Sequence, residues 1–305
     1  MATGLKRIAE RLLAASPIGK ISLMRTAPAT VVLAYHNIVP SGAHVCGDRS
    51  LHLDQSAFGA QLDLLSRLGS IVDLNDALTP RDPSDRVLRI VVTFDDAYRG
   101  TMTAGIEELA ARGLPATVFV PPGLLGSEGF WWDRVSTQGK TGLDPALRAH
   151  ALETLEGRGD RILMWATDSP QPPMRLPDHA RPVTETELLS DNLPGNITFG
   201  AHTWSHANLA ALSPEIAEEE MVRSKEWLAS RTDRYVDWIS YPYGLWNPSV
   251  ARIAGHCFSG ALLVDGGLVE RHGVWASPMS SIPRVNVPRG ISLEGLKLRV
   301  TGLLA

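Results

Sequence analysis

Two adjacent carboxylates, Asp95 and Asp96, follow an apolar segment that ends at Phe94. Neighbouring acids at the end of a buried strand repel one another and lose hydration, so they need solvent, hydrogen bonds or a nearby cation. Such a pair is often no more than a solvated loop. A metal ion that takes one carboxylate and leaves the other free as a base would relieve the repulsion, and it would also supply hydrolytic chemistry.

Two histidines, His202 and His206, provide the complementary half of such a site. They follow the apolar segment 197–201 and are four positions apart, so on a turn or helix start both imidazoles lie on one face. The spacing alone is weak evidence for a metal site, because histidine pairs also occur by chance. Joined with a carboxylate from another strand end, it predicts a two-histidine, one-carboxylate metal site with open positions for water and substrate.

Short apolar segments alternate with helical patterns along most of the chain, and these elements must position the candidate residues. The pattern predicts helices around 58–68 and 101–112 and a third helix that begins at Pro214, with Ser213 as its N-cap; Gly69 is expected to form a left-handed cap. Predicted strands cover residues 31–35, 88–94, 116–120, 197–201, 238–241, 260–264 and 282–287.

This alternation is typical of βα units with a mostly parallel sheet, either open or closed into a barrel. Active sites in such folds lie at the carboxyl ends of the strands. His36 and the Asp95–Asp96 pair both follow predicted strands directly, so we expect these residues to meet at one edge of the sheet.

Two segments depart from the alternation. Residues 1–29 predict an amphipathic helical extension, with leucines and an isoleucine on one face and basic side chains between them. The remaining residues, 30–305, are expected to form the catalytic domain. Within it, residues from about 136 to 196 have a weaker pattern and a proline-rich stretch, which we interpret as an inserted helical or loop lid.

Composition limits the partners and the compartment. The formal net charge is -4, which argues against nucleic acid as the main partner, and two cysteines are too few for a thiolate metal cluster. The first 28 residues contain no continuous apolar run of the length that a signal peptide or membrane span requires. We therefore expect a cytoplasmic protein without a transmembrane segment. The basic amphipathic start leaves peripheral contact with the inner face of the membrane open.

Three motifs in family order resemble the polysaccharide deacetylase family, the NodB-homology group known as carbohydrate esterase family 4. They are Thr93–Asp96, His202–His206 and Tyr241–Gly244. Weaker matches at 35–39, 130–133 and 282–285 extend the resemblance from about residue 30 to about residue 290. The resemblance implies a distorted (β/α) barrel that holds one divalent metal ion, most commonly Zn²⁺, with Co²⁺, Ni²⁺ or Mn²⁺ as alternatives.

The resemblance also implies a role for each motif residue. Asp96, His202 and His206 would be the metal ligands, Asp95 would be the general base, and the backbone N–H of Tyr243 would help to bind the oxyanion. Asp95 would take a proton from the attacking water, and an acid would then protonate the departing amine.

The sequence departs from the common family pattern in two ways. Ser240 stands where an arginine often precedes the third motif, and no late leucine-x-histidine segment supplies the usual acid. Some relatives carry circularly permuted motifs with the acid histidine on an early strand, and His36 resembles that arrangement; the alternative is a structural histidine. Arg284 is the candidate cation that keeps Asp95 charged, or else a packing arginine.

Several tryptophans could form faces on which sugar rings stack, although core packing is the more common role of such side chains. Trp131, Trp132 and Trp204 are the candidates for substrate contact, and Trp204 is the one expected to face the groove because it lies between the two histidines.

The functional hypothesis is a bacterial, metal-dependent hydrolase that removes N-acetyl groups from amino sugars of a poly- or oligosaccharide or its lipid-linked precursor, as in exopolysaccharide biosynthesis. One alternative keeps the metal chemistry but cleaves another small amide, such as a formamide. The other is a noncatalytic carbohydrate-binding relative, which the missing arginine and late histidine favour.

Overall fold

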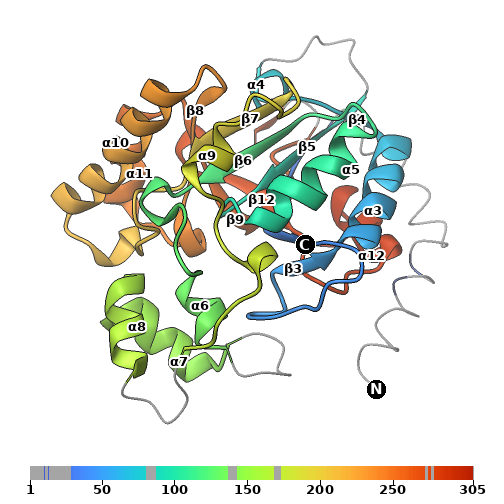
Figure 1. Cartoon of the computed structure of the whole chain (residues 1–305). Coiled ribbons are helices and arrows are strands. Elements are labelled where there is room, and N and C mark those ends of the chain that lie inside the picture. The colour runs from blue at the N-terminus through green and yellow to red at the C-terminus, as the bar shows by residue number, and fades with distance from the viewer. Residues whose placement is uncertain are drawn as a thin grey trace.

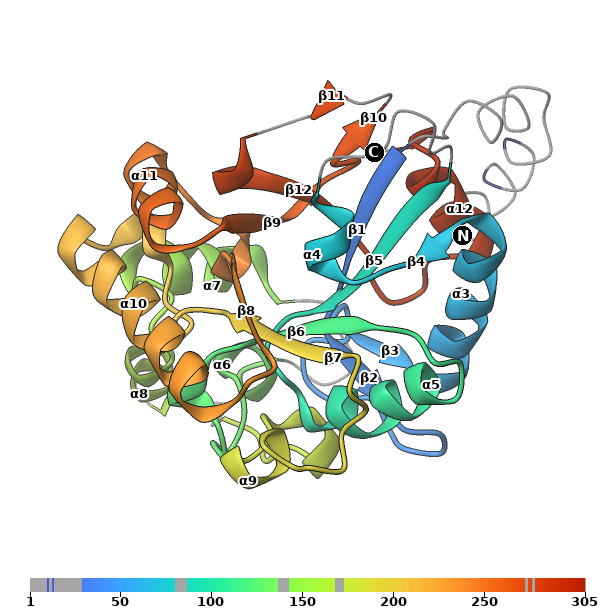
Figure 2. The same cartoon turned by 90° about the horizontal axis from the view of Figure 1, so that it is seen from above.

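The computed structural model describes Glu10, Leu13 and residues 29–79, 87–136, 143–167, 173–271, 274–275 and 278–304. In it, seven parallel strands close into a barrel. The order around the barrel is β1-β12-β9-β8-β7-β6-β5, and β5 pairs again with β1 (Figure 2). The closing pair keeps one register from Ala29 opposite Leu88 to Tyr35 opposite Phe94. The prediction of a (β/α) barrel is confirmed.

Each barrel strand overlaps a predicted segment, although β8 begins three residues before the segment predicted for it. Their bounds are β1 (Ala29–Tyr35), β5 (Leu88–Phe94), β6 (Ala116–Val120), β7 (Ile197–Ala201), β8 (Tyr235–Ser240), β9 (Gly260–Gly266) and β12 (Ile282–Asn286). Short strands β4 (Ser70–Ile71), β10 (Glu270–Arg271) and β11 (Val274–Trp275) extend the sheet, and β2 (Asn37–Val39) pairs separately with β3 (His52–Asp54).

Helices surround the barrel (Figure 1). The longer ones are α3 (Gln55–Leu68), α8 (Gly159–Thr167), α10 (Pro214–Arg231), α11 (Pro248–Cys257) and α12 (Leu293–Val300). Shorter ones are α4 (Leu74–Ala77), α5 (Ile106–Ala110), α6 (Trp131–Arg134), α7 (Pro145–Ala149) and α9 (Glu185–Leu188). The outward-facing side chains of the strands pack with α3, α5, α10, α11 and α12 into the larger of the apolar clusters.

A second apolar cluster fills the inside of the barrel. It takes one or two side chains from each of six strands, among them Val32, Val91, Phe119 and Trp238. Helix α4 closes the amino end, where Asn75 accepts a hydrogen bond from the indole of Trp238 at 2.7 Å. Because side chains alternate along a strand, the next inward positions toward the carboxyl ends are Thr93, Ser240 and Arg284, which are polar and buried. The barrel is therefore apolar at its base and polar at its mouth.

Two predicted details differ from the structure. Helix α3 does end before Gly69, but this glycine is extended (φ −169°) rather than left-handed. A Cβ atom there would lie 2.2 Å from the carbonyl oxygen of Leu88, so glycine is needed for close approach to β5. The helix predicted over 101–112 begins with a π-helical turn at Thr101–Gly105 before α5.

The regions outside the barrel are described in part. The predicted extension at residues 1–29 lies outside the described residues apart from Glu10, Leu13 and Ala29; the carboxylate of Glu10 accepts a 2.6 Å hydrogen bond from Ser292, the N-cap of α12. The predicted insertion contains α7, α8 and α9, and α8 packs against α6. Whether it acts as a lid stays a prediction.

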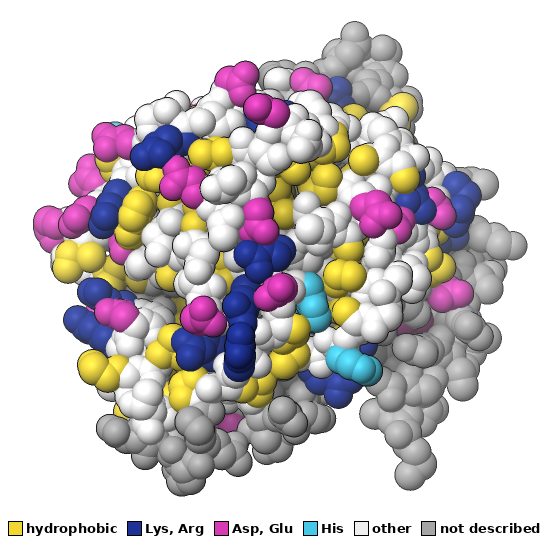
Figure 3. Space-filling model, viewed as in Figure 1, with side chains coloured by type: hydrophobic (Ala, Val, Ile, Leu, Met, Phe, Trp, Pro, Cys, Tyr) yellow, Lys and Arg dark blue, Asp and Glu magenta, His cyan; other side chains and the backbone are white. Residues whose placement is uncertain are grey.

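Acidic and basic side chains are interspersed over the face shown in Figure 3. Several form ion pairs, such as Arg99 with Glu187 at 2.9 Å and Arg112 with Asp63 at 2.7 Å. In the described part of the chain, none of the helices has the length and apolar character needed to span a bilayer.

Candidate metal centre and active site

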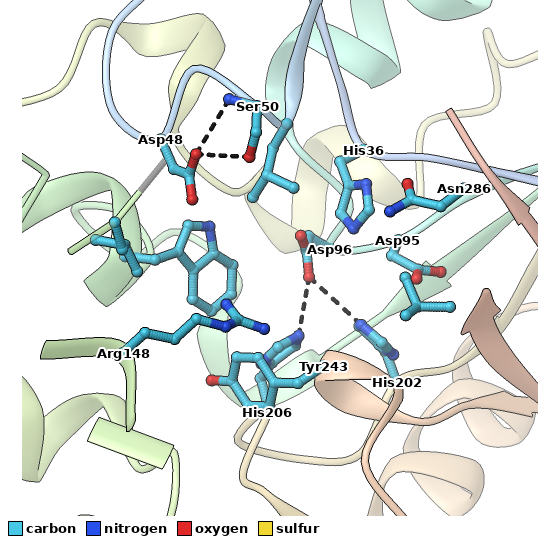
Figure 4. Close-up of a pocket in the computed structure, with 14 residues that line it drawn as sticks. His36, Asp48, Ser50, Asp95, Asp96, Arg148, His202, His206, Tyr243 and Asn286 are labelled. Atoms are coloured by element: carbon cyan, nitrogen blue, oxygen red, sulfur yellow. Dashed lines mark hydrogen bonds and ion pairs between the residues drawn. The ribbon is translucent and has the colours of Figure 1, made fainter. Parts of the chain in front are cut away.

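A cavity of about 360 Å³ opens at the carboxyl ends of the barrel strands (Figure 4). His36 follows β1, Asp95 and Asp96 follow β5, and His202 follows β7, while Tyr243 lies just beyond β8. Every residue of the three sequence motifs that was expected to do chemistry therefore lines one cavity, although the motifs are far apart in the chain. The parallel barrel brings them together because all its strands end on the same side.

The side chains of Asp96, His202 and His206 converge on one point. The Nε2 atoms of His202 and His206 lie 3.4 Å and 3.1 Å from the same Oδ1 atom of Asp96, and all three side chains are buried. The Nδ1 atom of His202 is 2.7 Å from the carbonyl oxygen of Ser240. A carbonyl only accepts, so Nδ1 of His202 carries the proton, and its Nε2 is left as an acceptor when the ring is neutral.

This arrangement fits a divalent cation. Asp96 Oδ1 is buried and receives no hydrogen bond from the described residues, although two imidazoles face it. The three ligand atoms lie within 4.8 Å of one another. Burial lowers the pKa of His206, which favours a neutral ring, whereas in His202 the charges of Asp95 and Asp96 outweigh burial and raise the pKa. The two carboxylates therefore attract positive charge at His202, and two imidazole nitrogens with one carboxylate form a donor set suited to zinc.

The backbone is strained at several residues in and beside this cluster. Asp96, Thr203, His206 and Tyr243 all have φ between 59° and 77°, a region that residues other than glycine rarely adopt. At the histidine turn, the hydroxyl of Thr203 accepts a 3.0 Å hydrogen bond from the N–H of His206. Strained backbone clusters at functional sites when the surrounding structure compensates, and here it aims the side chains into the cavity.

Asp95 is held by a fully buried arginine from another strand. Arg284 on β12 donates to both carboxylate oxygens of Asp95, at 2.9 Å and 2.6 Å, and it also donates to the hydroxyls of Thr93 and Ser240. Burial acts to raise the pKa of Asp95, but the charge of Arg284 and its neighbours outweighs this effect and lowers it. Asp95 is therefore ionised, as a general base must be.

Arg284 also explains the serine that stands before the third motif. Ser240 accepts a 2.8 Å hydrogen bond from Arg284 and lies 3.2 Å from Asp95. A small side chain at position 240 leaves room inside the barrel mouth, and the guanidinium that reaches Asp95 comes from β12 instead.

His36 lines the opposite side of the cavity from His206 and points toward Asp96 (Figure 4). Burial lowers its pKa, partly offset by the charges of Asp96 and Asp95. The lowered pKa favours the neutral ring, so His36 would have to gain a proton during the reaction before it could protonate a leaving amine. Its role as the acid stays a prediction.

The candidate aromatic residues lie in different places. Trp132 lines the cavity beside His206, with ring centres 4.8 Å apart. Trp131 is buried behind the cavity wall, where its indole donates a 2.8 Å hydrogen bond to the hydroxyl of Tyr243. This bond anchors the side chain of Tyr243 and thereby the turn that carries its backbone N–H.

Trp204 lies away from the metal cavity, contrary to the expectation that it faces the substrate groove. It lines a separate cavity of about 510 Å³, and the guanidinium of Arg223 lies 3.8 Å from its ring centre. The positive φ of Thr203 turns the chain between the two histidines, so the intervening tryptophan is directed outward, toward α10.

Sequence reasoning missed a contact that holds the histidine turn. Glu220 on α10 accepts hydrogen bonds from the N–H and the hydroxyl of Ser205, at 2.8 Å and 2.7 Å. No local pattern links residue 220 to residue 205, because the contact depends on how α10 packs beside β7.

Comparisons with known proteins identify the family of this chain. The model of the polysaccharide deacetylase family matches residues 83–257, more than half of the 305 residues, so the chain belongs to that family. This confirms the resemblance and supports carbohydrate deacetylation as the activity. The matched region ends before β12 and begins after β1, so Arg284 and His36 lie outside it. No curated protein matches the chain significantly in sequence.

Solved structures share the fold. The deacetylase PplD of Streptococcus pyogenes, solved with acetate, has a TM-score of 0.60 at 19% identity, covering 90% of this chain and 99% of that one. IcaB from Ammonifex degensii has a TM-score of 0.58 at 18% identity, with 90% and 97% covered. A polysaccharide deacetylase from Bacillus cereus has a TM-score of 0.59 at 18% identity, with 90% and 69% covered.

The buried pair predicts a large effect of Arg284→Met on stability. Removing the guanidinium leaves the charge of Asp95 buried without its partner, so we expect the free energy of unfolding to fall by about 3–5 kcal/mol. Chemical denaturation measures this, with Arg231→Met as the control, because Arg231 forms its ion pair with Glu185 at the exposed surface. Adding Asp95→Asn should restore part of the loss. Equal effects of Arg284→Met and Arg231→Met would contradict this account.

The contact of Glu220 predicts a selective effect on metal binding. In Glu220→Ala the turn between the histidines loses two hydrogen bonds, so we expect the affinity for Zn²⁺ to fall by about ten- to a hundredfold. Chelator competition measures the affinity, and circular dichroism checks the fold. Glu219→Ala is the matched control. Glu219 lines the cavity beside Trp204, as Glu220 does, but the two hydrogen bonds from Ser205 go to Glu220. Wild-type affinity in Glu220→Ala would show that the turn does not depend on this contact.

Proposed function

We propose that this chain is a metal-dependent N-deacetylase that hydrolyses the acetamide of an amino sugar within a poly- or oligosaccharide or its lipid-linked precursor. The single observation that supports this most directly is the convergence of Asp96, His202 and His206 beside an ionised Asp95 in one cavity. Family membership supports the carbohydrate substrate and the deacetylation.

Three residues would hold the ion, which we expect to be Zn²⁺. Asp96 would contribute one carboxylate oxygen, and His202 and His206 would contribute their Nε2 atoms. When bound, such an ion polarises the amide carbonyl and lowers the pKa of water toward about 7. The remaining steps belong to the side chains of the chain itself.

Asp95 would act as the general base. Its carboxylate lies beside the ligand cluster and is kept ionised by Arg284, so it can accept a proton from water at neutral pH. Arg284 itself is buried and saturated with hydrogen bonds, so we assign it the positioning of this carboxylate rather than contact with substrate.

Two further groups would complete the reaction. The backbone N–H of Tyr243, on the strained turn after β8, would donate to the oxygen that gains negative charge. His36, across the cavity, would give a proton to the departing amine so that the sugar leaves as a neutral amine rather than an amide anion.

Acetate release from N-acetylglucosamine oligomers tests this function. The Zn²⁺-loaded wild type should release acetate, and Asp95→Asn should lower kcat by at least about a hundredfold because no base remains to take the proton. Zn²⁺ affinity should survive in this variant, whereas His202→Ala should lose both metal and activity. N-formyl analogues, assayed in parallel, report whether a smaller amide is preferred.

Undiminished acetate release by Asp95→Asn would overturn the assignment of the base. Binding of the oligomers without acetate release by the metal-loaded wild type would instead identify a noncatalytic carbohydrate-binding relative.

A further inference from the structure

One arginine of the insertion reaches into the metal cavity. Arg148 lies on α7, whose N-terminus is capped by Asp144, and its side chain lines the cavity next to Tyr243. The guanidinium carbon is 6.0 Å from the centre of the Tyr243 ring. In Figure 4, Arg148 and Asp48 enter the cavity from one side, while His36 and Asn286 enter it from the other.

The charge of Arg148 has no partner in the described part of the chain. Other arginines of the insertion do form ion pairs there: Arg161 lies 2.7 Å from Glu156, and Arg158 lies 3.6 Å from Asp160. The nearest aromatic ring offers only a weak attraction at 6.0 Å. Without substrate, water solvates the exposed guanidinium, so leaving its charge unpaired costs the free enzyme little free energy.

Substrate binding would remove water from the guanidinium of Arg148. Apolar side chains make up much of the wall around Arg148, including Leu51, Trp132 and Leu143. A sugar that fills the cavity displaces water from the guanidinium, and a neutral group beside it would leave a charge poorly solvated and unpaired. An anionic group on the substrate would replace the lost water with a charge-assisted, planar pair of hydrogen bonds.

The second charged group of this wall restricts where the anion can lie. Asp48 is buried, and one of its carboxylate oxygens accepts hydrogen bonds from the N–H and the hydroxyl of Ser50, at 3.0 Å and 2.6 Å. A second negative charge near Asp48 would be repelled, whereas sugar hydroxyls could donate to it. The anion is therefore directed toward Arg148.

We propose that Arg148 forms an anion subsite in this cavity, and that the substrate is an acidic glycan or sugar phosphate in which a carboxylate or phosphate lies next to the acetylated amino sugar. This inference rests on the proposed function, because it takes the contents of the cavity to be an amino sugar. It adds the requirement that the substrate carries a negative charge, which removal of an acetyl group does not itself need.

Matched substrates test the subsite. Acetate release is compared for a neutral methyl glycoside of N-acetylglucosamine, for N-acetylglucosamine 1-phosphate and for a disaccharide with glucuronic acid linked to N-acetylglucosamine. We expect at least one anionic substrate to exceed the neutral one by about tenfold or more in kcat/KM, mainly through KM. Arg148→Gln should abolish that preference, because kcat/KM should fall by at least about tenfold more for the anionic substrate than for the neutral one. The phosphate and uronate arms distinguish the two sources of the anion.

Arg158→Gln is the control, since this arginine belongs to the same insertion but lines the cavity beside Trp204. A preference that survives Arg148→Gln, or equal kcat/KM for neutral and anionic substrates, would overturn the subsite. If neither these three sugars nor the N-acetylglucosamine oligomers released acetate, the proposed function would fail, and calorimetric binding of the three sugars would still decide the subsite. Binding of an anionic sugar that is lost in Arg148→Gln would support it, and equal binding of all three would refute it.

Discussion

Two adjacent carboxylates buried in the mouth of a closed barrel need two separate positive charges, and this constraint organises the site. Arg284 meets the need of Asp95 from inside the barrel, with both carboxylate oxygens paired. Asp96 faces two imidazoles and has an oxygen without a hydrogen bond from the described residues. This difference in partners supports the roles that we propose for the two acids, because Asp95 is paired by the protein whereas Asp96 is left available to a cation.

The fold makes this arrangement rigid. The barrel is closed, so β1, β5, β7, β8 and β12 hold fixed positions relative to one another, and their carboxyl ends surround one cavity. The positive φ values at Asp96 and His206 cost free energy, and they persist because the packing of the surrounding strands fixes the backbone there. The insertion contributes Leu143 and Arg148 to the wall of this cavity, and Arg148 adds a positive charge there.

The sequence predicted well those features that depend on local pattern. The bounds of β5 and the start of α10, with Ser213 as its cap, follow from apolar periodicity and capping residues. The parallel topology then placed His36, Asp95 and His202 at one end of the barrel, because strand order does not affect which end is the carboxyl end.

Features that depend on packing between distant segments could not be predicted in this way. The direction of Trp204 depends on the left-handed turn at Thr203, and that conformation has no reliable signal in a threonine. Glu220 meets Ser205 only because α10 lies beside β7, and Arg148 reaches the cavity only through the path of the insertion. Arg284 was a candidate from its motif, but its burial inside the barrel required the alternation of β12 to be known.

A crystal structure of the protein grown with Zn²⁺, with anomalous scattering recorded at the zinc absorption edge, tests the central claim most directly. We expect one zinc ion within about 2.0–2.2 Å of the Asp96 carboxylate and of the Nε2 atoms of His202 and His206. Asp95 should remain paired with Arg284 and outside the coordination sphere. An ion bound elsewhere, or an ion held by Asp95 in place of Asp96, would contradict the account.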